Sequence, residues 1–215
     1  MRYPSSLALS DARPKEPEFI VPLRVPRDQL PPATKVRSTL LASSLKSIRE
    51  HGHYDKYLAA LSDEWREPIL NAVAGVWLPI GAGIAHYHAC DALGLLPHEQ
   101  MAIGREVGDR IQGTFLSTMI RAAKNAGVTP WTALGYTGKL YERLFEGGGC
   151  CVTKLGPKDA RADMVRNAIV GMPYFRNGFR GLYQVGVELF CARAYVTEVG
   201  GASSETDCAV RISWA

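Results

Sequence analysis

The sequence predicts an α+β fold in which a helical N-terminal half packs on a small antiparallel sheet near the C-terminus. Two observations support this prediction. Apolar residues recur at helical spacing through the N-terminal half, whereas residues 147–215 contain two strand-like pairs around one helix. Helices that precede a cluster of strands are typical of α+β domains.

The composition is that of an ordinary globular protein and excludes several classes of function. The chain has 215 residues, of which 47% are hydrophobic and 21% charged, and its formal net charge is +4. Lys and Arg are scattered along the chain, so we expect no nucleic-acid partner. Five cysteines without CxxC spacing argue against a disulfide framework or a zinc site. No signal peptide is apparent, and we expect a reducing, cytoplasmic location.

The segment from Ile69 to Cys90 is the candidate for a membrane span, because it contains no Asp, Glu, Lys or Arg. It is interrupted by Pro79 and is rich in Gly and Ala rather than in strongly apolar residues. We therefore expect a buried core segment and no membrane partner.

Residues 1–35 are predicted to form a proline-rich extended arm. Seven of the thirteen prolines lie before residue 33, and this density prevents a helix. Within the arm, Glu18–Val25 is expected to form a short strand that Pro22 confines to a sheet edge. This strand clasps either the body of this chain or a neighbouring subunit. Residues 36–215 are predicted to form a single domain, with a helical part at 36–146 and a sheet part at 147–215.

Caps and apolar periodicity define the expected helices of the N-terminal half. Ser62 is a suitable N-cap with acidic residues after it, Pro97 suits a first helical turn, and Thr129 with Pro130 forms a cap and first-turn pair. The predicted helices span residues 37–60 with a break at the HGHYD stretch, 63–76, 80–93, 97–127 and 130–146.

The sheet part is expected to contain a strand pair, a helix and a second strand pair. Cys150–Leu155 and Ala160–Ile169 are joined by a Gly-Pro-Lys-Asp turn. A helix over Pro173–Ala192 follows. Ala194–Val199 and the alternating residues 208–214 form the second pair.

The helix over Pro173–Ala192 carries a polar stripe, formed by Arg176, Arg180, Gln184 and Glu188 at four-residue spacing. Two like charges at i and i+4 are mildly destabilising unless an anion or a carboxylate binds to them. Two interpretations stay open at this stage, a solvated stripe and a phosphate or carboxylate site. The apolar residues expected to pack on the sheet are Phe175, Phe179, Leu182 and Leu189.

Catalytic motifs are absent from the sequence. It has no GxSxG, no HExxH and no GxxxxGK[ST] motif, so we expect no enzyme. His86 and Cys90, at i and i+4, are the candidate ligands of a metal or haem. Two such residues without a further cluster do not make a site, so we expect neither a metal nor a cofactor.

Four runs of residues carry a resemblance to a known family: IGREVGDRIQGTFL, AGVTPWTALGYTGKLYERLFEGGG, PYFRNG and CAVRISWA. Together they cover Ile103–Ala215 and resemble an uncharacterised paralogous family described mainly from myxobacteria. The order of strand pair, helix and strand pair is also distantly similar to the vinyl-4-reductase fold group, with TRAPP subunits and haem-based nitric oxide sensors. This similarity implies a sensor or assembly module that binds small apolar molecules. The haem sensors carry Tyr-x-Ser-x-Arg, and the run from Tyr174 to Gly178 lacks its Ser.

Together these features predict a non-enzymatic, sensor-like module that forms a dimer and binds a small apolar or amphipathic ligand between the helices and the sheet. The expected lining residues are Phe175, Phe179, Tyr183, Trp77 and Trp131. Arg176 or Arg180 is expected to orient a polar end of the ligand. Ordinary core packing is the alternative explanation for these aromatic residues. Two other functions stay open, a scaffolding protein that assembles through the proline-rich arm and a haem-binding gas sensor.

Overall fold

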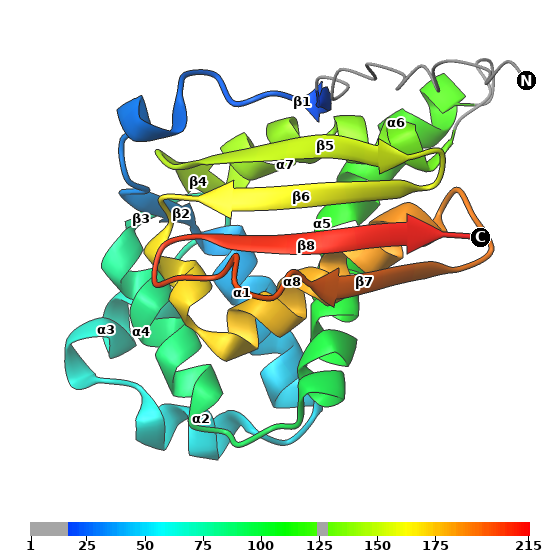
Figure 1. Ribbon diagram of the computed structural model, residues 1–215. Helices are drawn as coiled ribbons and strands as arrows, with labels where there is room; N and C mark the ends of the chain where they lie inside the picture. The colour runs from blue at the N-terminus through cyan, green and yellow to red at the C-terminus, as the bar shows by residue number, and fades with distance from the viewer. Residues whose placement is uncertain (1–16, 124–128) are drawn as a thin grey trace, which may run out of the picture.

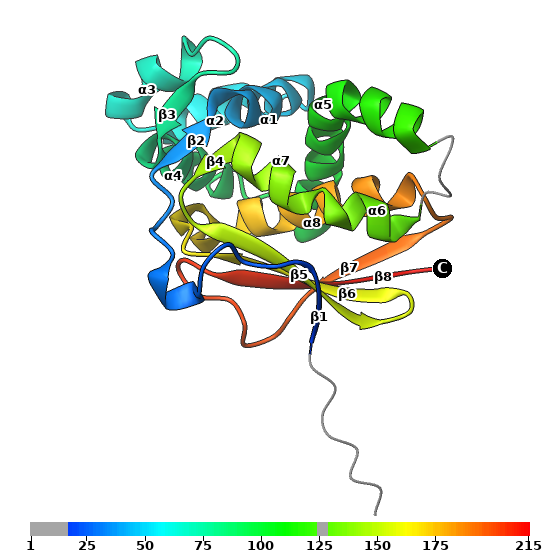
Figure 2. The ribbon, with the colours of Figure 1, turned by 90° about the horizontal axis from the view of Figure 1, so that it is seen from above.

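The computed structural model describes residues 17–123 and 129–215, with the backbone alone for residues 112–123. It contains helices and two antiparallel sheets, so the predicted α+β class is confirmed. The strands of the larger sheet lie in front of the helices in Figure 1, and Figure 2 shows the helices stacked on one face of that sheet.

The larger sheet has five strands in the order β1-β5-β6-β8-β7, and all neighbours are antiparallel. Its strands are β1 (Glu18–Val21), β5 (Gly149–Gly156), β6 (Asp159–Val165), β7 (Ala194–Glu198) and β8 (Cys208–Trp214). As the alternating sequence of β8 predicts, Val210 and Ile212 point into the core with the inner face of the sheet. The N-terminal strand lies at an edge, as Pro22 requires, and it clasps the body of this chain.

A second, smaller sheet was not predicted. It has the order β3-β2-β4 and consists of β2 (Lys35–Arg37), β3 (Trp77–Pro79) and β4 (Phe145–Glu146). Lys35 pairs with Pro79 on one side and with Glu146 on the other. Strands this short carry no periodicity, and their pairing depends on contacts far apart in the chain.

The helices largely follow the predicted order. They are α1 (Ser38–Glu50), α2 (Tyr54–Ala60), α3 (Asp63–Leu70), α4 (Ile80–Asp91), α5 (Pro97–Ala123), α6 (Pro130–Gly135), α7 (Thr137–Leu144) and α8 (Pro173–Glu188). Ser62 and Thr129 are N-caps, and Thr129 forms a capping box with Thr132. The expected end of the long helix at Gly127 lies outside the described residues.

Four boundaries differ from the prediction. Helix α3 ends at Leu70, and the helix expected over 130–146 is interrupted at Tyr136. Strand β6 ends at Val165, because Arg166 adopts a φ of 55° and a 3-10 turn (η2, Ala168–Gly171) follows. Helix α8 ends at Glu188, four residues earlier than expected.

Helix α8 lies between α5 and the sheet, and glycines allow its close contact with α5. A Cβ atom on Gly104 would lie 2.0 Å from the carbonyl oxygen of Gly178, and one on Gly181 would lie 2.2 Å from that of Met101. The two backbones therefore touch directly, which explains Gly104 and Gly181, whereas a Cβ atom on Gly178 would make only ordinary contacts.

The apolar face of α8 is divided between two cores, contrary to the expectation that it packs on the sheet alone. Phe175 packs in the core of the helical layer, whereas Tyr183 and Val187 pack against the sheet. Leu189 is 39% exposed and follows the end of the helix. The helix is buried on two sides, and a pattern of apolar residues alone does not say which layer each one faces.

Candidate functional site

A cleft of about 450 Å³ lies beneath the N-terminal segment. This segment contributes Val21–Val25, Leu30 and Pro31 to the cleft. The body of the chain contributes Trp77 of β3, Tyr141 of α7, Phe145 of β4 and the backbone of Gly147–Gly149, among other residues. The volume lies within the range of about 300–1,000 Å³ that is typical of small-molecule sites.

The Gly147–Gly149 turn fixes the position of the segment over the body. Gly147 and Gly148 have φ values of 81° and 60°, which other residues rarely adopt. A Cβ atom on Gly147 would lie 2.2 Å from the carbonyl oxygen of Pro32. The N–H of Gly148 donates to the Pro31 carbonyl at 2.8 Å, and the Tyr141 hydroxyl donates to the Gly147 carbonyl at 3.0 Å. The glycine run is therefore the attachment point of the segment as well as a helix stop.

The cleft is apolar inside and charged at its rim. Arg24 and Glu142 form an exposed ion pair at 2.5 Å, and Lys35 binds Glu146 at 3.0 Å. Burial raises the pKa of the Cys150 thiol to about 12 and raises the pKa of Tyr141 well above its usual value. Both groups are therefore neutral at physiological pH. This arrangement suits a molecule with an apolar body and a polar end that reaches the rim.

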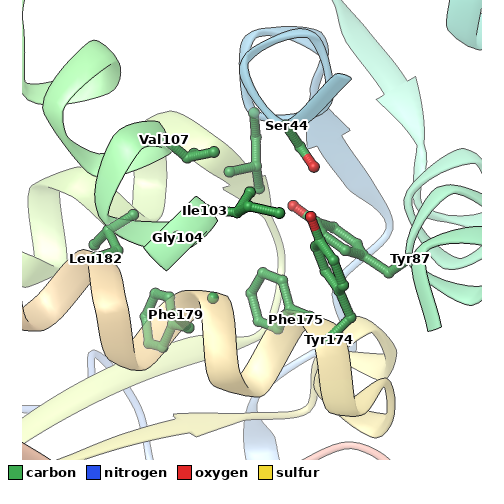
Figure 3. A pocket seen from close by; sticks show the side chains of 11 residues that line it. Ser44, Tyr87, Ile103, Gly104, Val107, Tyr174, Phe175, Phe179 and Leu182 are labelled. Atoms are coloured by element: carbon green, nitrogen blue, oxygen red, sulfur yellow. The ribbon is translucent and has the colours of Figure 1, made fainter. Parts of the chain in front are cut away.

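A second, much smaller cavity of about 30 Å³ lies between α1, α4, α5 and α8 (Figure 3). Ile103, Val107, Phe175, Phe179 and Leu182 supply most of its apolar lining. A space of this size holds one or two water molecules.

Hydroxyl groups gather at one side of the small cavity. The hydroxyls of Tyr87 and Tyr174 point toward Ser44 in Figure 3. The Tyr174 hydroxyl is buried and has no hydrogen-bond partner among the described residues, whereas Ser44 is bonded to His86. An unpaired buried hydroxyl costs about 1–3 kcal/mol, which a water molecule in the cavity would offset.

Ser44 belongs to a buried hydrogen-bond network centred on His86. The Nδ1 atom of His86 lies 2.8 Å from the Tyr57 hydroxyl, its Nε2 atom lies 3.0 Å from Ser44 Oγ, and Cys90 Sγ lies 3.6 Å from Nε2. Burial lowers the pKa of His86 to about 3 and raises the pKa of Cys90 well above its usual value. The network joins α1, α2 and α4 in a neutral state.

The Ser44–His86–Tyr57 arrangement has the spacing of a nucleophile, a base and an orienting group. Activation of a serine requires a histidine that accepts its proton near neutral pH. The lowered pKa of His86 removes that capacity, and all three side chains are buried. The network therefore links α1, α2 and α4 inside the helical layer.

The predicted lining residues lie in four separate places. Phe175 and Phe179 line the small cavity, and Tyr183 lies with Phe179 at a further void of about 10 Å³ beneath α7. Trp131 packs edge-on against Trp214, with ring centroids 4.7 Å apart. Trp77 lines the large cleft. Of these aromatic residues, Trp77 alone lies at the large cleft among the pockets that the described residues line, and a role of the others in ligand binding stays a prediction.

The polar stripe of α8 contacts the edge strand β7 and the turn before the helix. Arg180 donates to the Val196 carbonyl at 3.2 Å, and Gln184 donates to the Ala194 carbonyl at 3.2 Å. Arg176 donates to the Val170 carbonyl at 2.9 Å and lies 3.4 Å from Glu198. Main-chain carbonyl groups and the Glu198 carboxylate therefore stabilise the two like charges of Arg176 and Arg180. The stripe also occupies backbone groups of β7 that would otherwise be free to pair with another strand. A role of the arginines in ligand binding stays a prediction.

Several residues of the large cleft were missed by the sequence analysis. Leu23 and Leu30 belong to the predicted arm, and Tyr141 and Phe145 lie at the end of the predicted helical part. Two features together could have indicated the cleft: apolar residues in the proline-rich arm, and a glycine run elsewhere in the chain. Glycines allow another backbone to approach closely, so the run is a place where the arm could cross the body.

Metal-binding clusters and membrane spans were sought among the described residues. In this part of the chain, no three His, Cys, Asp or Glu side chains gather where they could hold a metal ion. No helix in the same part combines the length and apolarity that a bilayer span requires.

Comparison with known proteins identifies the fold. No protein-family model matches the chain, and no curated protein matches it.

Several solved structures of H-NOX proteins match the chain, and each of these matches covers 83% of it. An unliganded Fe(II) H-NOX mutant from K. algicida matches with a TM-score of 0.63 at 8% identity and 96% coverage of that chain. An oxygen-binding H-NOX domain related to soluble guanylate cyclases matches with a TM-score of 0.53 at 15% identity and 94% coverage. A T. Tengcongensis H-NOX mutant matches with a TM-score of 0.51 at 16% identity and 97% coverage. This protein therefore has the fold seen in H-NOX domains, and its resemblance to the myxobacterial family stays a prediction.

Proposed function

We propose that this protein is a sensor-like module that binds a small apolar or amphipathic molecule in the cleft beneath its N-terminal segment. The observation that carries the proposal is the cleft of about 450 Å³ with an apolar interior and a charged rim. The likeness to H-NOX domains supports a sensor role, because the matched structures include ligand-binding domains. The cleft replaces the helix–sheet interface as the proposed ligand site.

The ligand chemistry follows from the lining. Trp77, Tyr141 and Phe145 offer aromatic surface to an apolar body, and the neutral Cys150 thiol adds no charge. The ion pair between Arg24 and Glu142 is exposed, so each partner is free to turn toward the polar end of a ligand. We expect a molecule that is neutral along its body and polar at one end.

Haem binding is the second candidate function, and the fold of the matched H-NOX structures favours it. The donor atoms of the described residues do not fit a haem. Both ring nitrogens of His86 are hydrogen-bonded, one to Tyr57 and the other to Ser44. The other four histidines lie in the helical half, where three are exposed and one is partly exposed. The candidate donors in the cleft are Tyr141 and Cys150, which bind iron as anions, and burial raises the pKa of both. The cavity of about 30 Å³ beside α8 is far too small for a porphyrin.

Binding of an amphipathic dye tests the proposal directly. We expect 8-anilinonaphthalene-1-sulfonate to bind at one site with increased fluorescence, because it has an aromatic body and one charged end. Val25→Asp places a negative charge at the mouth of the cleft, beside the anionic end of the dye, and should weaken binding up to about tenfold. Val73→Asp is the matched control, because Val73 is exposed on a loop that does not line the cleft.

Native mass spectrometry and absorption spectroscopy complete the test. Protein expressed with haem supplied should show no haem mass and no porphyrin absorption band. A porphyrin band that survives gel filtration would favour the second candidate. Equal dye binding by the wild type and Val25→Asp would contradict the proposed site.

A further inference from the structure

The middle of the N-terminal segment covers the cleft with few attachments. In residues 22–29, Leu23 is half-buried and the other side chains are exposed. A hydrogen bond from the Gln29 N–H to the Pro26 carbonyl is internal to this stretch. No backbone hydrogen bond links residues 22–29 to the rest of the described chain. Segments with little burial and few backbone bonds open at low free energy.

Both ends of this stretch are fixed by backbone hydrogen bonds. On one side, β1 pairs with β5 as far as Val21. On the other side, the Pro31 carbonyl accepts from Gly148 at 2.8 Å, and the Ala33 N–H donates to the Arg166 carbonyl at 2.7 Å. Residues 22–29 therefore form a strap that is fastened at each end and free between.

Two ion pairs hold the middle of the strap. Arg24 binds Glu142 at 2.5 Å, and Arg27 binds Asp207 at 2.7 Å. The arginine side chains are 76% and 57% exposed. Exposed pairs contribute little to stability and are screened by salt. The carboxylate of Asp207 is nevertheless well positioned, because it also accepts the Arg166 N–H at 2.7 Å.

We propose that residues 22–29 are a gate over the cleft, held shut by the Arg24–Glu142 and Arg27–Asp207 pairs, and that the ligand enters when these pairs break. This inference rests on the proposed function for the identity of what passes the gate. The opening itself is a property of the chain without ligand. Access to the cleft therefore increases with ionic strength.

Cys150 reports on the gate from inside the cleft. It lines the cleft and is 7% exposed. A Cβ atom on the neighbouring Gly149 would lie 3.2 Å from side-chain carbons of both Leu23 and Leu30, so the strap covers this part of the wall. Cys90 is fully buried in the helical layer and does not line the cleft. It is an internal reference for general unfolding.

The test is the rate at which iodoacetamide alkylates Cys150 in the intact protein, read by peptide mass spectrometry with Cys90 in the same sample. Loss of one exposed ion pair in Arg27→Gln should raise the rate up to about fivefold. The double variant with Arg24→Gln should raise it up to about 25-fold. High salt should accelerate the wild type and leave the double variant unchanged. Arg211→Gln removes an exposed pair with Asp159 on the sheet and should have no effect.

The outcomes separate the gate from the proposed function. Faster alkylation of Cys150 with unchanged Cys90 supports the gate, even if no dye binds and the proposed function fails. Equal rates at Cys150 in the wild type and the double variant would overturn the gate, even if dye binding places the ligand in the cleft. A parallel rise at Cys90 would also overturn it, because the ion pairs would then stabilise the whole fold.

Discussion

The buried histidine of α4 makes stability depend on pH in a way that can be calculated. His86 is fully buried between Tyr57 and Ser44, and its folded-state pKa is about 3, against an unfolded value of 6.5. Between these two values the unfolded chain binds a proton that the folded chain does not. The free energy of unfolding therefore falls as the pH drops below 6.5. Above pH 6.5 the contribution of neutral His86 is fully present.

The magnitude follows from the two pKa values. One pKa unit corresponds to about 1.4 kcal/mol, so acidification from pH 7 to pH 5 should remove about 2 kcal/mol through this residue. At pH 4 the loss reaches about 3 kcal/mol. Carboxylates also titrate in this range, so the wild-type curve alone does not isolate the histidine. The variant His86→Gln isolates the contribution of the histidine, because an amide can hydrogen-bond to both neighbours but does not take up a proton.

The assay is urea unfolding at pH 7, 6 and 5, followed by tryptophan fluorescence. At pH 7, His86→Gln should be less stable than the wild type by about 1–3 kcal/mol, because the amide fits the two hydroxyls imperfectly. That difference should shrink by about 2 kcal/mol at pH 5. His88→Gln is the matched control, since His88 is exposed on the same helix. It should follow the wild type at every pH.

A constant difference between the wild type and His86→Gln from pH 7 to pH 5 would refute the reasoning. It would mean that the pKa of His86 is the same in the folded and unfolded states. A change in the His88→Gln curve of equal size would also refute it, because the effect would then belong to any histidine of α4.

Two further variants test the packing of α8. Gly104→Ala places a Cβ atom 2.0 Å from the Gly178 carbonyl oxygen and should destabilise the protein by about 1–3 kcal/mol in urea unfolding, whereas Gly200→Ala, with open space around it, should be neutral. Arg180→Ala removes the bonds to the Val196 carbonyl, so we expect a lower Tm and concentration-dependent association through β7, with dye binding unchanged. Loss of dye binding would instead place Arg180 in the ligand site, as the sequence analysis predicts.

Elements with a local signal could be predicted from the sequence. The Thr129–Pro130 pair marks the start of α6, and the alternation from Cys208 to Trp214 predicts the span of β8, although Ala209 on the predicted outer face is also buried. In each case a single short stretch determines the conformation, through a cap or through a strand with one buried face. Such signals predict most helices and the C-terminal strands in their order, but not the three short strands of the small sheet.

The small sheet and the cleft could not be predicted in the same way. Lys35 pairs with Pro79 and Glu146, which lie far from it in the chain, and three-residue strands give no periodicity. The like charges of Arg176 and Arg180 indicated that an anion binds near them. Nothing in the sequence shows that backbone carbonyls would bind the two arginines instead. Hydrogen bonds to main-chain groups depend on the fold and leave no pattern in the residue types.

The same packing explains why the space for a ligand lies outside the helix–sheet interface. Helices α5 and α8 touch at Gly104 and Gly178, and the cavity that the described residues line beside this contact has a volume of about 30 Å³. Among the polar groups near this cavity, His86 bonds both Tyr57 and Ser44, whereas the Tyr174 hydroxyl has no partner among the described residues. Among the pockets that the described residues line, the cleft where the N-terminal segment crosses the glycine turn is large enough for a small molecule. The proposed gate makes ligand entry depend on a segment held by two exposed ion pairs, so conditions that loosen those pairs should increase access to the cleft.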